Sequence, residues 1–301
     1  MEARIMDGRE IAKKLTGHYS HVVEQLQAKH IHPKIVDITV GHDPASQVYV
    51  RQKEKKAKKL GIQFEKVNFD ETLTTEDIIQ QIQKYNDDPQ VTGILVQHPL
   101  PVNFDDELIA SSIDPMKDID GTNAKNIGHL VQGSERFMPC TPRAVLKIIE
   151  AYKINLSTKR IAMIGKSQIV GLPMAIILAH TDVTVTLCHR LTQNIKEIML
   201  ASDIIIVAAG DPEFIKSDMV KPGAVVIDIG INQLDDGRIV GDCEFESVSK
   251  VASMITPVPG GIGPLTVMML MENTLKAACF QHHLNPKKYL GEEPLHAIYT
   301  I

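Results

Sequence analysis

The basic segment between Gly41 and Gly61 holds the residues whose spacing is easiest to connect with chemistry. It reads GHDPASQVYVRQKEKKAKKLG and places six basic residues against one glutamate between Val50 and Leu60. If the segment is helical, Tyr49 and Lys53 are four residues apart and face the same way. The segment is then either a solvated basic face or the carrier of one lysine that does chemistry. The spacing alone favours a solvated face for most of these lysines.

A glycine-containing turn at Gly165 indicates a second kind of chemistry. RIAMIGKSQIVGLPMAIILA predicts a strand, a tight turn at Gly165 and a helix, with Ser167 where a second glycine is usual and then Gly171. Such a turn lets the backbone approach a phosphate at a helix N-terminus. The Ser167 hydroxyl can donate to a phosphate, and Pro173 suits the first helical turn. An ordinary βα turn is the alternative, but the flanking strand and helix favour a nucleotide site.

The next strand indicates which dinucleotide would bind. VTVTLCHR ends in His189 and Arg190 without an acidic residue, and Lys166 adds a cation beside the turn. An acid at this place would bind the ribose hydroxyls of NAD, whereas an arginine accommodates the extra phosphate of NADP. We therefore expect NADP, the alternative being that both cations are merely solvated.

Two strand ends and one loop complete the predicted cofactor side. AAGDP and DIGIN, the latter with Ile231, follow apolar strands where a doubly wound sheet presents its ligands. The loop ITPVPGGIGPLT carries Pro259, Gly260 and Gly261 just before a helix. Such a loop is either a rigid turn or a close-approach surface for a flat ligand.

The elements that must position these residues are parallel strands alternating with helices. The strands are predicted in seven apolar runs: KIVDITVG, QFEKVNF, VTGILVQ, RIAMIG, DVTVTLCH, DIIIVAAG and AVVIDIGIN. Continuous apolar runs with helices between them are typical of parallel sheets buried on both faces. Asp43 and Pro44 predict the start of the basic helix and Gly61 its end. The fold class is α/β.

We predict two α/β domains, the second a Rossmann-like doubly wound sheet, with a cleft between them. Residues 1–140 and 275–301 would form the substrate and catalytic domain, and residues 141–274 the NADP-binding domain. A final apolar, Met-rich helix from about Pro264 to His282 would return to the first domain. The role of the C-terminal stretch after it is not indicated by its residues.

Composition excludes several classes of protein. The chain has 301 residues, a net charge of −5 and 4% aromatic residues, which argues against a dedicated nucleic-acid binder. Its four cysteines form no CxxC pair, so we expect free thiols in a reducing compartment and no metal site. No signal peptide or membrane-spanning run is recognised, so a cytoplasmic location is expected.

Seven motifs in register resemble one family. PASQVYVRQKEKKAKKLGI, GILVQHPLP, KDIDGTN, PCTPRAV, GKSQIVGLPMA, VIDIGIN and TPVPGGIGPLTVMMLMENT are similar to those of the bifunctional methylenetetrahydrofolate dehydrogenase/methenyltetrahydrofolate cyclohydrolase family. The resemblance covers nearly all of the chain to about residue 282. It implies oxidation of 5,10-methylenetetrahydrofolate by NADP⁺, then hydrolysis to 10-formyltetrahydrofolate at the same site, in one-carbon metabolism and purine biosynthesis.

The resemblance also implies four site residues. Lys53 would be the catalytic lysine, Gln97 its hydrogen-bond partner, Tyr49 a stacking platform for the folate ring, and Asp120 an acceptor for pterin N–H groups. A lysine side chain, with an ordinary pKa of about 10.4, is a poor base at neutral pH. Burial beside a cationic substrate and a neutral amide favours the amine form, and a glutamine does not anchor the positive charge as a carboxylate does.

The resemblance implies a homodimer, formed through the nucleotide domain. The outer lysines of the basic helix are expected to help hold the anionic glutamate tail of folates, including polyglutamylated forms. Two departures from the family pattern adjoin the sites. Lys166 stands where arginine is commoner, so it would bind phosphate without a bidentate fork. His98 replaces a usual apolar residue, and the DGTN continuation is uncommon.

Three rival functions remain open from the residues. A shikimate- or amino-acid-type dehydrogenase would share the nucleotide half but not need Tyr49, Lys53, Gln97 and Asp120. A monofunctional dehydrogenase would lack only the hydrolytic step, against which Lys53 argues. A nucleotide-sensing or nucleic-acid-binding protein would use the basic helix and show salt-sensitive retention on a polyanion without turnover.

Overall fold

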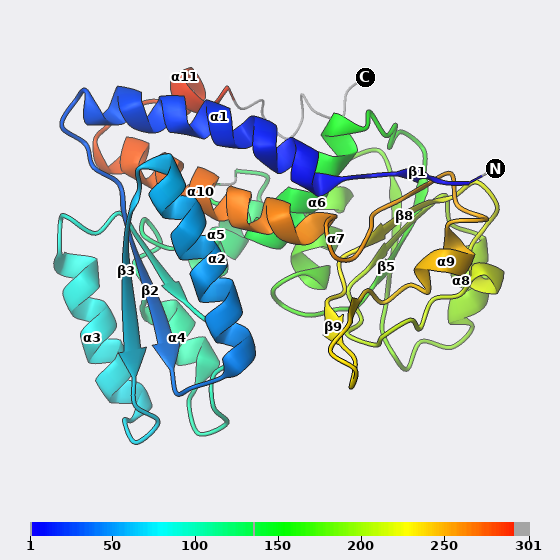
Figure 1. Ribbon diagram of the computed structural model, residues 1–301, viewed down its shortest axis with the longest axis horizontal. Coiled ribbons are helices and arrows are strands. Elements are labelled where there is room, and N and C mark those ends of the chain that lie inside the picture. The colour runs from blue at the N-terminus through cyan, green and yellow to red at the C-terminus, as the bar shows by residue number, and fades with distance from the viewer. Residues whose placement is uncertain (1, 135, 292–301) are drawn as a thin grey trace. The chain divides into compact units, whose positions relative to one another are not determined.

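The structure, a computed structural model, describes residues 2–134 and 136–291, which form two compact α/β units. Unit 1 contains residues 2–13 and Thr141–Thr266, and unit 2 contains residues 14–140 and 267–291. Each unit has its own parallel sheet, and the two sheets are visible in Figure 1. The predicted fold class, two α/β domains with a Rossmann-like second sheet, is confirmed.

Unit 2 is built on a three-stranded parallel sheet of order β3-β2-β4. Its strands are β2 (Lys34–Val40), β3 (Gln63–Phe69) and β4 (Gly93–Val96). Five helices lie wholly within this unit: α2 (Pro44–Leu60), α3 (Thr75–Asp87), α4 (Asp106–Ser112), α5 (Ala124–Val131) and α11 (Lys287–Leu290). Helices α1 (Gly8–Gln27) and α10 (Ile262–Gln281) have residues in both units, and α6 (Cys140–Ala151) has only its first residue in unit 2.

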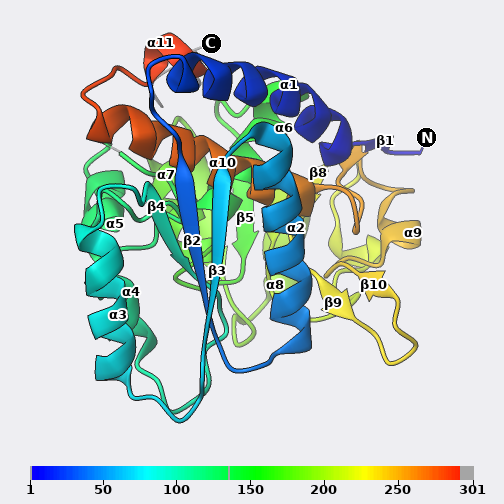
Figure 2. The ribbon, with the colours of Figure 1, turned by 60° about the vertical axis from the view of Figure 1, so that its left-hand side comes forward.

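The central strand β2 sends alternate side chains to opposite faces of its sheet. One set, with Val36 and Ile38, packs into a buried cluster with Ile78 and Ile82 of α3 and Ile109 of α4. Figure 2 shows α3 and α4 on this side of β2 and β3, with α2 on the other. The remaining side chains of β2 therefore face α2.

Unit 1 is built on a six-stranded parallel sheet of order β1-β11-β8-β7-β5-β6. Its strands are β1 (Arg4–Ile5), β5 (Arg160–Ile164), β6 (Thr184–Cys188), β7 (Ile204–Val207), β8 (Val225–Asp228) and β11 (Met254–Ile255). A short hairpin, β9 (Asn232–Gln233) and β10 (Ile239–Val240), lies outside it. The helical elements are α6 (Cys140–Ala151), α7 (Gly171–Ala179), α8 (Ile195–Leu200), η1 (Ser217–Met219) and α9 (Phe245–Val248).

The strand order of unit 1 reverses at β5. The chain passes from β5 outward to β6, then returns across β5 to form β7 on its other side. Ligands of open α/β sheets bind at such a switch point, beyond the carboxyl ends of the strands. All seven strands predicted from apolar runs are present, whereas the two-residue strands β1, β9, β10 and β11 were not predicted.

The two units divide the chain differently from the predicted domains at two places. Residues 2–13 belong to unit 1 because β1 pairs with β11, with Ile5 opposite Ile255. Within α10 the division falls after Thr266 instead of after residue 274. Both divisions have a boundary after residue 140, and the predicted place of residues 292–301 lies outside the described residues.

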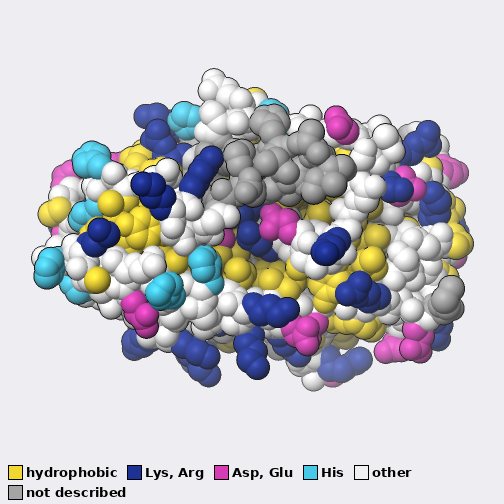
Figure 3. Space-filling model, turned by 90° about the horizontal axis from the view of Figure 1, so that it is seen from above, with side chains coloured by type: hydrophobic (Ala, Val, Ile, Leu, Met, Phe, Trp, Pro, Cys, Tyr) yellow, Lys and Arg dark blue, Asp and Glu magenta, His cyan; other side chains and the backbone are white. Residues whose placement is uncertain are grey.

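The cysteines are free, as expected from composition, and all four are buried. No helix among the described residues is both long and apolar enough to span a bilayer. On the face shown in Figure 3, basic side chains lie among acidic, histidine and apolar ones.

Candidate active site

Helix α2 forms as the sequence predicts. It carries Tyr49 and Lys53, which the four-residue spacing places on one face. Asp43 caps the helix by accepting a hydrogen bond from the Ser46 N–H at 2.7 Å, and Gly61 ends it in the left-handed conformation at φ 82°. Lys53 is only 6% exposed, whereas Tyr49 one turn earlier is 36% exposed. Burial raises the pKa of the Tyr49 phenol.

The other lysines of α2 divide into two groups. The Lys56 amine donates to Thr16 Oγ1 at 3.2 Å, and burial lowers the pKa of Lys56. The exposed cations are Arg51, Lys55, Lys58 and Lys59. Lys58 pairs with Glu54 at 2.8 Å, so part of the basic face is neutralised within the helix. The interpretation of this face as largely solvated is confirmed, and Lys53 is the buried exception.

Gln97 presents its side-chain oxygen to Lys53. Gln97 directly follows β4, where its N–H donates to the Ile38 carbonyl of β2 at 2.8 Å. Its Nε2 donates to the His98 carbonyl at 2.7 Å, which orients Oε1 toward the lysine. Lys53 Nζ donates to that oxygen at 2.8 Å. The predicted lysine–glutamine pair is therefore present.

Asp120 lies near Lys53 and Gln97 because the segment that carries it runs beside β4. The Ile94 N–H donates to the Lys117 carbonyl at 2.8 Å, and an isolated bridge joins Ile94 to Asp118. Burial raises the pKa of Asp120, while the nearby charges of Lys53 and His98 oppose that rise. Lys53, Gln97 and Asp120 are thus brought together within unit 2.

Two residues that the sequence reasoning missed hold the Asp120 segment in place. Asp118 is buried and accepts hydrogen bonds from the N–H groups of Gly121 and Asn123 and from Asn126 Nδ2, at 2.8–3.0 Å. Burial raises the pKa of Asp118 to about 6. Asn273 of α10 donates to the Ile119 carbonyl at 2.9 Å. The first aspartate of KDID thus shapes the loop, while the second is directed to the site.

Asp37 is the most consequential residue that was not predicted. It lies in β2 on the face opposite Val36 and Ile38, is 1% exposed, and its Oδ2 is 2.5 Å from Lys53 Nζ. Burial raises the pKa of Asp37, while the charge of Lys53 opposes that rise. From the sequence, Lys53 was expected beside a neutral amide and a cationic substrate, and this carboxylate partner was not foreseen. The available signal was an aspartate inside the apolar run KIVDITV.

The glycine turn of unit 1 has the geometry that a phosphate site requires. Gly165 has φ 111°, and a side chain there would meet the Ala208 carbonyl oxygen at 2.2 Å. A side chain at Gly171 would meet the Gly165 oxygen at 1.9 Å, so helix α7 can begin against the turn only with glycine there. Ser167 Oγ accepts from the Val170 N–H at 3.2 Å, which leaves its hydroxyl hydrogen available to donate.

Lys166 and Arg190 lie at the carboxyl ends of neighbouring strands. Ile164 of β5 and Cys188 of β6 are paired, and each cation stands two residues beyond its member of that pair. The Gly165 N–H donates to the Cys188 carbonyl at 2.9 Å, which ties the two strand ends together. Both side chains are exposed. The predicted pair of cations thus flanks the glycine turn.

The strand ends AAGDP and DIGIN are held by two buried carboxylates. Asp242 accepts from the N–H groups of Ala209, Gly210 and Asp211 at 2.6–3.1 Å. Asp228 accepts from the Cys243 N–H at 2.8 Å. These amides are therefore engaged within the protein. Ile231, 46% exposed, stands three residues after the end of β8.

The loop with Pro259, Gly260 and Gly261 packs against the start of α1. The Gly8 N–H donates to the Gly260 carbonyl at 3.0 Å, and Arg9 Nη2 donates to the Pro259 carbonyl at 3.2 Å. A side chain at Gly8 would meet the Gly261 oxygen at 1.8 Å. Close packing of backbone on backbone thus accounts for the glycines, which supports the rigid-turn alternative.

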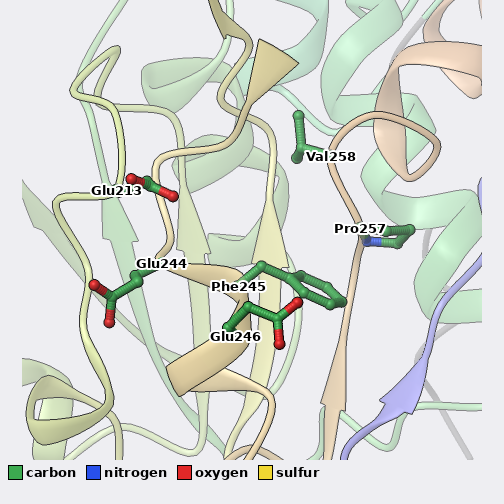
Figure 4. A pocket seen from close by; sticks show the side chains of 6 residues that line it. All are labelled: Glu213, Glu244, Phe245, Glu246, Pro257 and Val258. Atoms are coloured by element: carbon green, nitrogen blue, oxygen red, sulfur yellow. The ribbon is translucent and has the colours of Figure 1, made fainter. Parts of the chain in front are cut away.

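A pocket of about 290 Å³ lies elsewhere in unit 1. Figure 4 shows Glu213, Glu244, Phe245 and Glu246 on one side of it and Pro257 and Val258 on the other. Three carboxylates repel a phosphate, and none of the predicted site residues lines this pocket. The glycine turn, with its two cations, is the better phosphate site.

Comparison with known proteins gives a consistent result over both units. Residues 139–282 match the family model described as tetrahydrofolate dehydrogenase/cyclohydrolase, NAD(P)-binding domain, and residues 6–120 match the catalytic domain of the same description. The bifunctional protein FolD of Acetivibrio thermocellus is 47% identical over 281 residues, which cover 93% of this chain and 99% of that protein.

Two solved structures are similar over nearly the whole chain. The bifunctional FolD enzyme of Campylobacter jejuni has 43% identity and a TM-score of 0.90, covering 92% of this chain and 98% of its own. The FolD of Trypanosoma brucei, complexed with NADP cofactor and inhibitor, has 36% identity and a TM-score of 0.89, covering 92% and 98%.

Proposed function

The chain belongs to the tetrahydrofolate dehydrogenase/cyclohydrolase family, and from this premise we propose that it oxidises 5,10-methylenetetrahydrofolate with NADP⁺ and hydrolyses the methenyl product to 10-formyltetrahydrofolate. The observation that carries the assignment to residues is the buried Lys53 amine, hydrogen-bonded to Gln97 at 2.8 Å beside Asp120. A solvated basic helix does not need a buried lysine. The dehydrogenase rivals of other families are set aside by the family membership.

Lys53 performs the proton transfers of the hydrolytic step. Water adds to the methenyl carbon through its oxygen, and the proton that it loses passes to the Lys53 amine. The carbon–nitrogen bond of the ring then breaks, and its electron pair stays on nitrogen, which takes up a proton as the formyl C=O forms. One proton is released overall. A positioned side chain contributes most when its proton affinity suits the working pH.

Tyr49 and Asp120 orient the folate. The Tyr49 ring, one turn from Lys53 and partly exposed, offers a face on which a pterin can stack. The Asp120 carboxylate accepts hydrogen bonds from the pterin amino group and ring N–H. Gln97 fixes the amine so that proton transfer has a defined direction. Unit 2, which carries Lys53 and Asp120, is therefore the substrate and catalytic domain.

Unit 1 carries the dinucleotide site, and its residues fit NADP. The bare backbone of Gly165 and Gly171 allows a pyrophosphate to approach, and the Ser167 hydroxyl can donate to it. Lys166 and Arg190, each two residues beyond paired strand ends, would receive a 2′-phosphate, and β6 is followed by His189 and Arg190 instead of an acid. When bound, NADP⁺ accepts the hydride. Ile231 and the loop Pro259–Gly261 are proposed to contact the coenzyme and the folate.

A coupled assay tests this function. Purified protein is mixed with 5,10-methylenetetrahydrofolate and NADP⁺ or NAD⁺, and reduced coenzyme, methenyl and 10-formyl products are resolved without acid. Lys53→Ala should lower the enzymatic hydrolysis rate by about 10²-fold or more. Arg190→Ala should raise the KM for NADP⁺ by about tenfold and leave that for NAD⁺ unchanged. Reduced coenzyme with only spontaneous hydrolysis would mean a monofunctional dehydrogenase.

A homodimer formed through unit 1 is proposed on a separate observation. Strand β6 is the edge of the six-stranded sheet, and its Leu187 is 36% exposed. Ile169 and Leu172, before and in the adjacent helix α7, are 41% and 42% exposed. An open strand edge next to apolar side chains suits pairing with a second copy. Sedimentation velocity at micromolar concentration should give the mass of a dimer.

The exposed cations of α2 are proposed to attract the glutamate tail of folates. Arg51, Lys55 and Lys59 are exposed along a helix that also carries Lys53. Affinity for a polyglutamylated folate should fall as salt rises, because exposed charges are screened. A salt-independent affinity would contradict this role. The four free, buried cysteines support a reducing compartment such as the cytoplasm.

A further inference from the structure

Asp37 is a buried carboxylate that the proposed reaction does not yet use. It comes from β2, whereas Lys53 comes from α2 and Gln97 follows β4, so three separate elements converge on one amine. Lys53 Nζ lies 2.5 Å from Asp37 Oδ2 and 2.8 Å from Gln97 Oε1. The amine therefore stands between a charged and a neutral acceptor.

The second oxygen of Asp37 distinguishes this pair from an ordinary buried salt bridge. Oδ1 is buried and has no hydrogen-bond partner among the described residues, and the likewise buried Oδ2 has only its ion-pair contact with Lys53. A buried carboxylate with an unsatisfied oxygen is costly as an anion, because neither water nor a donor replaces its hydration. A carboxylic acid has a smaller demand for donors. The surroundings thus favour a proton on this carboxyl group more than a fully bonded salt bridge would.

The groups around Asp37 act on its pKa in opposite directions, with desolvation the largest influence. Asp120 lies close enough for its negative charge to raise the pKa of Asp37, while Lys53 lowers it. Cys140, through a hydrogen bond, and His98, through its charge, lower the pKa of Asp120. Desolvation is the largest influence on Asp37 and raises its pKa. A cationic folate bound beside Lys53 would repel the ammonium form and so favour transfer of its proton to Asp37.

We propose that Asp37 acts through Lys53 as a proton store, so that the pair changes between ammonium–carboxylate and amine–carboxylic acid. In the transfer the N–H bond of the ammonium breaks and its electron pair stays on nitrogen, while an O–H bond forms on Asp37 Oδ2. The amine then accepts the proton of the attacking water. No external base is required. This positioning role rests on the proposed function and gives Lys53 a route to the base form at neutral pH.

The test compares the dehydrogenase and cyclohydrolase activities of Asp37→Asn with those of wild type across a range of pH. Loss of the carboxylate should lower kcat for methenyl hydrolysis by about 10²-fold at pH 7 and move the acidic limb of its pH profile to higher pH. The dehydrogenase kcat should change by less than about threefold, since hydride transfer needs little acid–base help. Thr39→Val is the matched control, because Thr39 lies two residues further along the same face of β2 and is also buried.

An equal fall in kcat of both activities, with the acidic limb of the hydrolysis pH profile unchanged, would overturn the proposal. Asp37 would then be only a structural counter-ion. If Asp37→Asn does not fold, wild-type protein carrying ¹⁵N-lysine and ¹³C-aspartate is examined by NMR. With methenyl and 10-formyl folate at equilibrium, the Asp37 carboxyl should become protonated as the Lys53 amine forms. A carboxyl that stays ionised would contradict the transfer. Failure of wild type to hydrolyse the methenyl compound would reject the proposed function instead.

Discussion

At the scale of single residues, Lys53 has two acceptors of different character. The Gln97 amide oxygen, at 2.8 Å, accepts without fixing a charge, whereas the Asp37 carboxylate, at 2.5 Å, attracts the ammonium form. The balance between these two acceptors decides how readily Lys53 loses its proton and can act as a base. Changing the charge of the neutral acceptor should therefore alter the hydrolysis more than changing any exposed charge nearby.

Gln97→Glu should slow methenyl hydrolysis at pH 7 by about tenfold or more. A second carboxylate on Lys53 stabilises the ammonium and removes the base form that water requires. Stopped-flow absorbance of the methenyl compound measures the rate. Gln52→Glu adds the same charge at an exposed position of α2 next to Lys53, and it should change the rate by less than about twofold. Equal effects of the two variants would contradict the role of Gln97.

At the scale of elements, α2 depends on its N-cap to present Tyr49 and Lys53. The Asp43 carboxylate accepts the Ser46 N–H at 2.7 Å, directly before the turn that leads to Tyr49. Helix α4 offers a parallel case, because Asp105 accepts the Leu108 N–H at 2.9 Å. The two caps are chemically alike, but only α2 carries predicted site residues.

Asp43→Ala and Asp105→Ala should each lower the free energy of unfolding by about 1 kcal/mol, the usual effect of a lost N-cap. Urea denaturation measures this quantity. The KM for the folate should rise severalfold in Asp43→Ala only, because fraying of the first turn of α2 displaces Tyr49. Matching kinetics in the two variants would show that the cap of α2 does not influence the site.

At the scale of the whole molecule, each unit encloses carboxylates whose ionisation opposes folding. Burial raises the pKa of Asp228 in unit 1 to about 7, well above the ordinary value of 3.8. A folded-state pKa above the unfolded one means that the folded protein binds the proton more tightly. The contribution to stability is therefore complete below about pH 4 and is lost as the pH rises through about 7.

Thermal unfolding across pH 4–7 should show this loss. The Tm of wild type should carry a component that falls with rising pH, and Asp228→Asn should flatten it. Asp203→Asn is the control: bonds from the Arg160 N–H and from Lys221 lower the pKa of Asp203, so its contribution is lost only below about pH 4 and this variant should leave the slope across pH 4–7 unchanged. An unchanged slope in Asp228→Asn would reject the assignment to Asp228.

Much of the fold and of the site could be predicted because the relevant signals are local. Apolar runs gave the seven longer strands, and Asp43 and Gly61 gave the limits of α2. Gly165 and Gly171 are needed by the close approach of their own turn to Ala208 and to helix α7. The roles of Tyr49, Lys53, Gln97 and Asp120 were implied by the resemblance of seven motifs to one family. Each of these signals is carried by neighbouring residues and so can be recognised from the amino-acid sequence.

Only the tertiary structure decided which distant residues share an environment. β1 joined unit 1 because two residues near the N-terminus pair with β11, and a two-residue strand has no sequence pattern of its own. Asp37 became the partner of Lys53 because the pleat of β2 turns it toward α2 and burial removes its water. Residue types and spacing thus determined the candidate chemistry. Packing decided that the Asp37 carboxylate lies beside the Lys53 amine. Desolvation and ion pairing depend on neighbours in space, which the linear sequence does not specify.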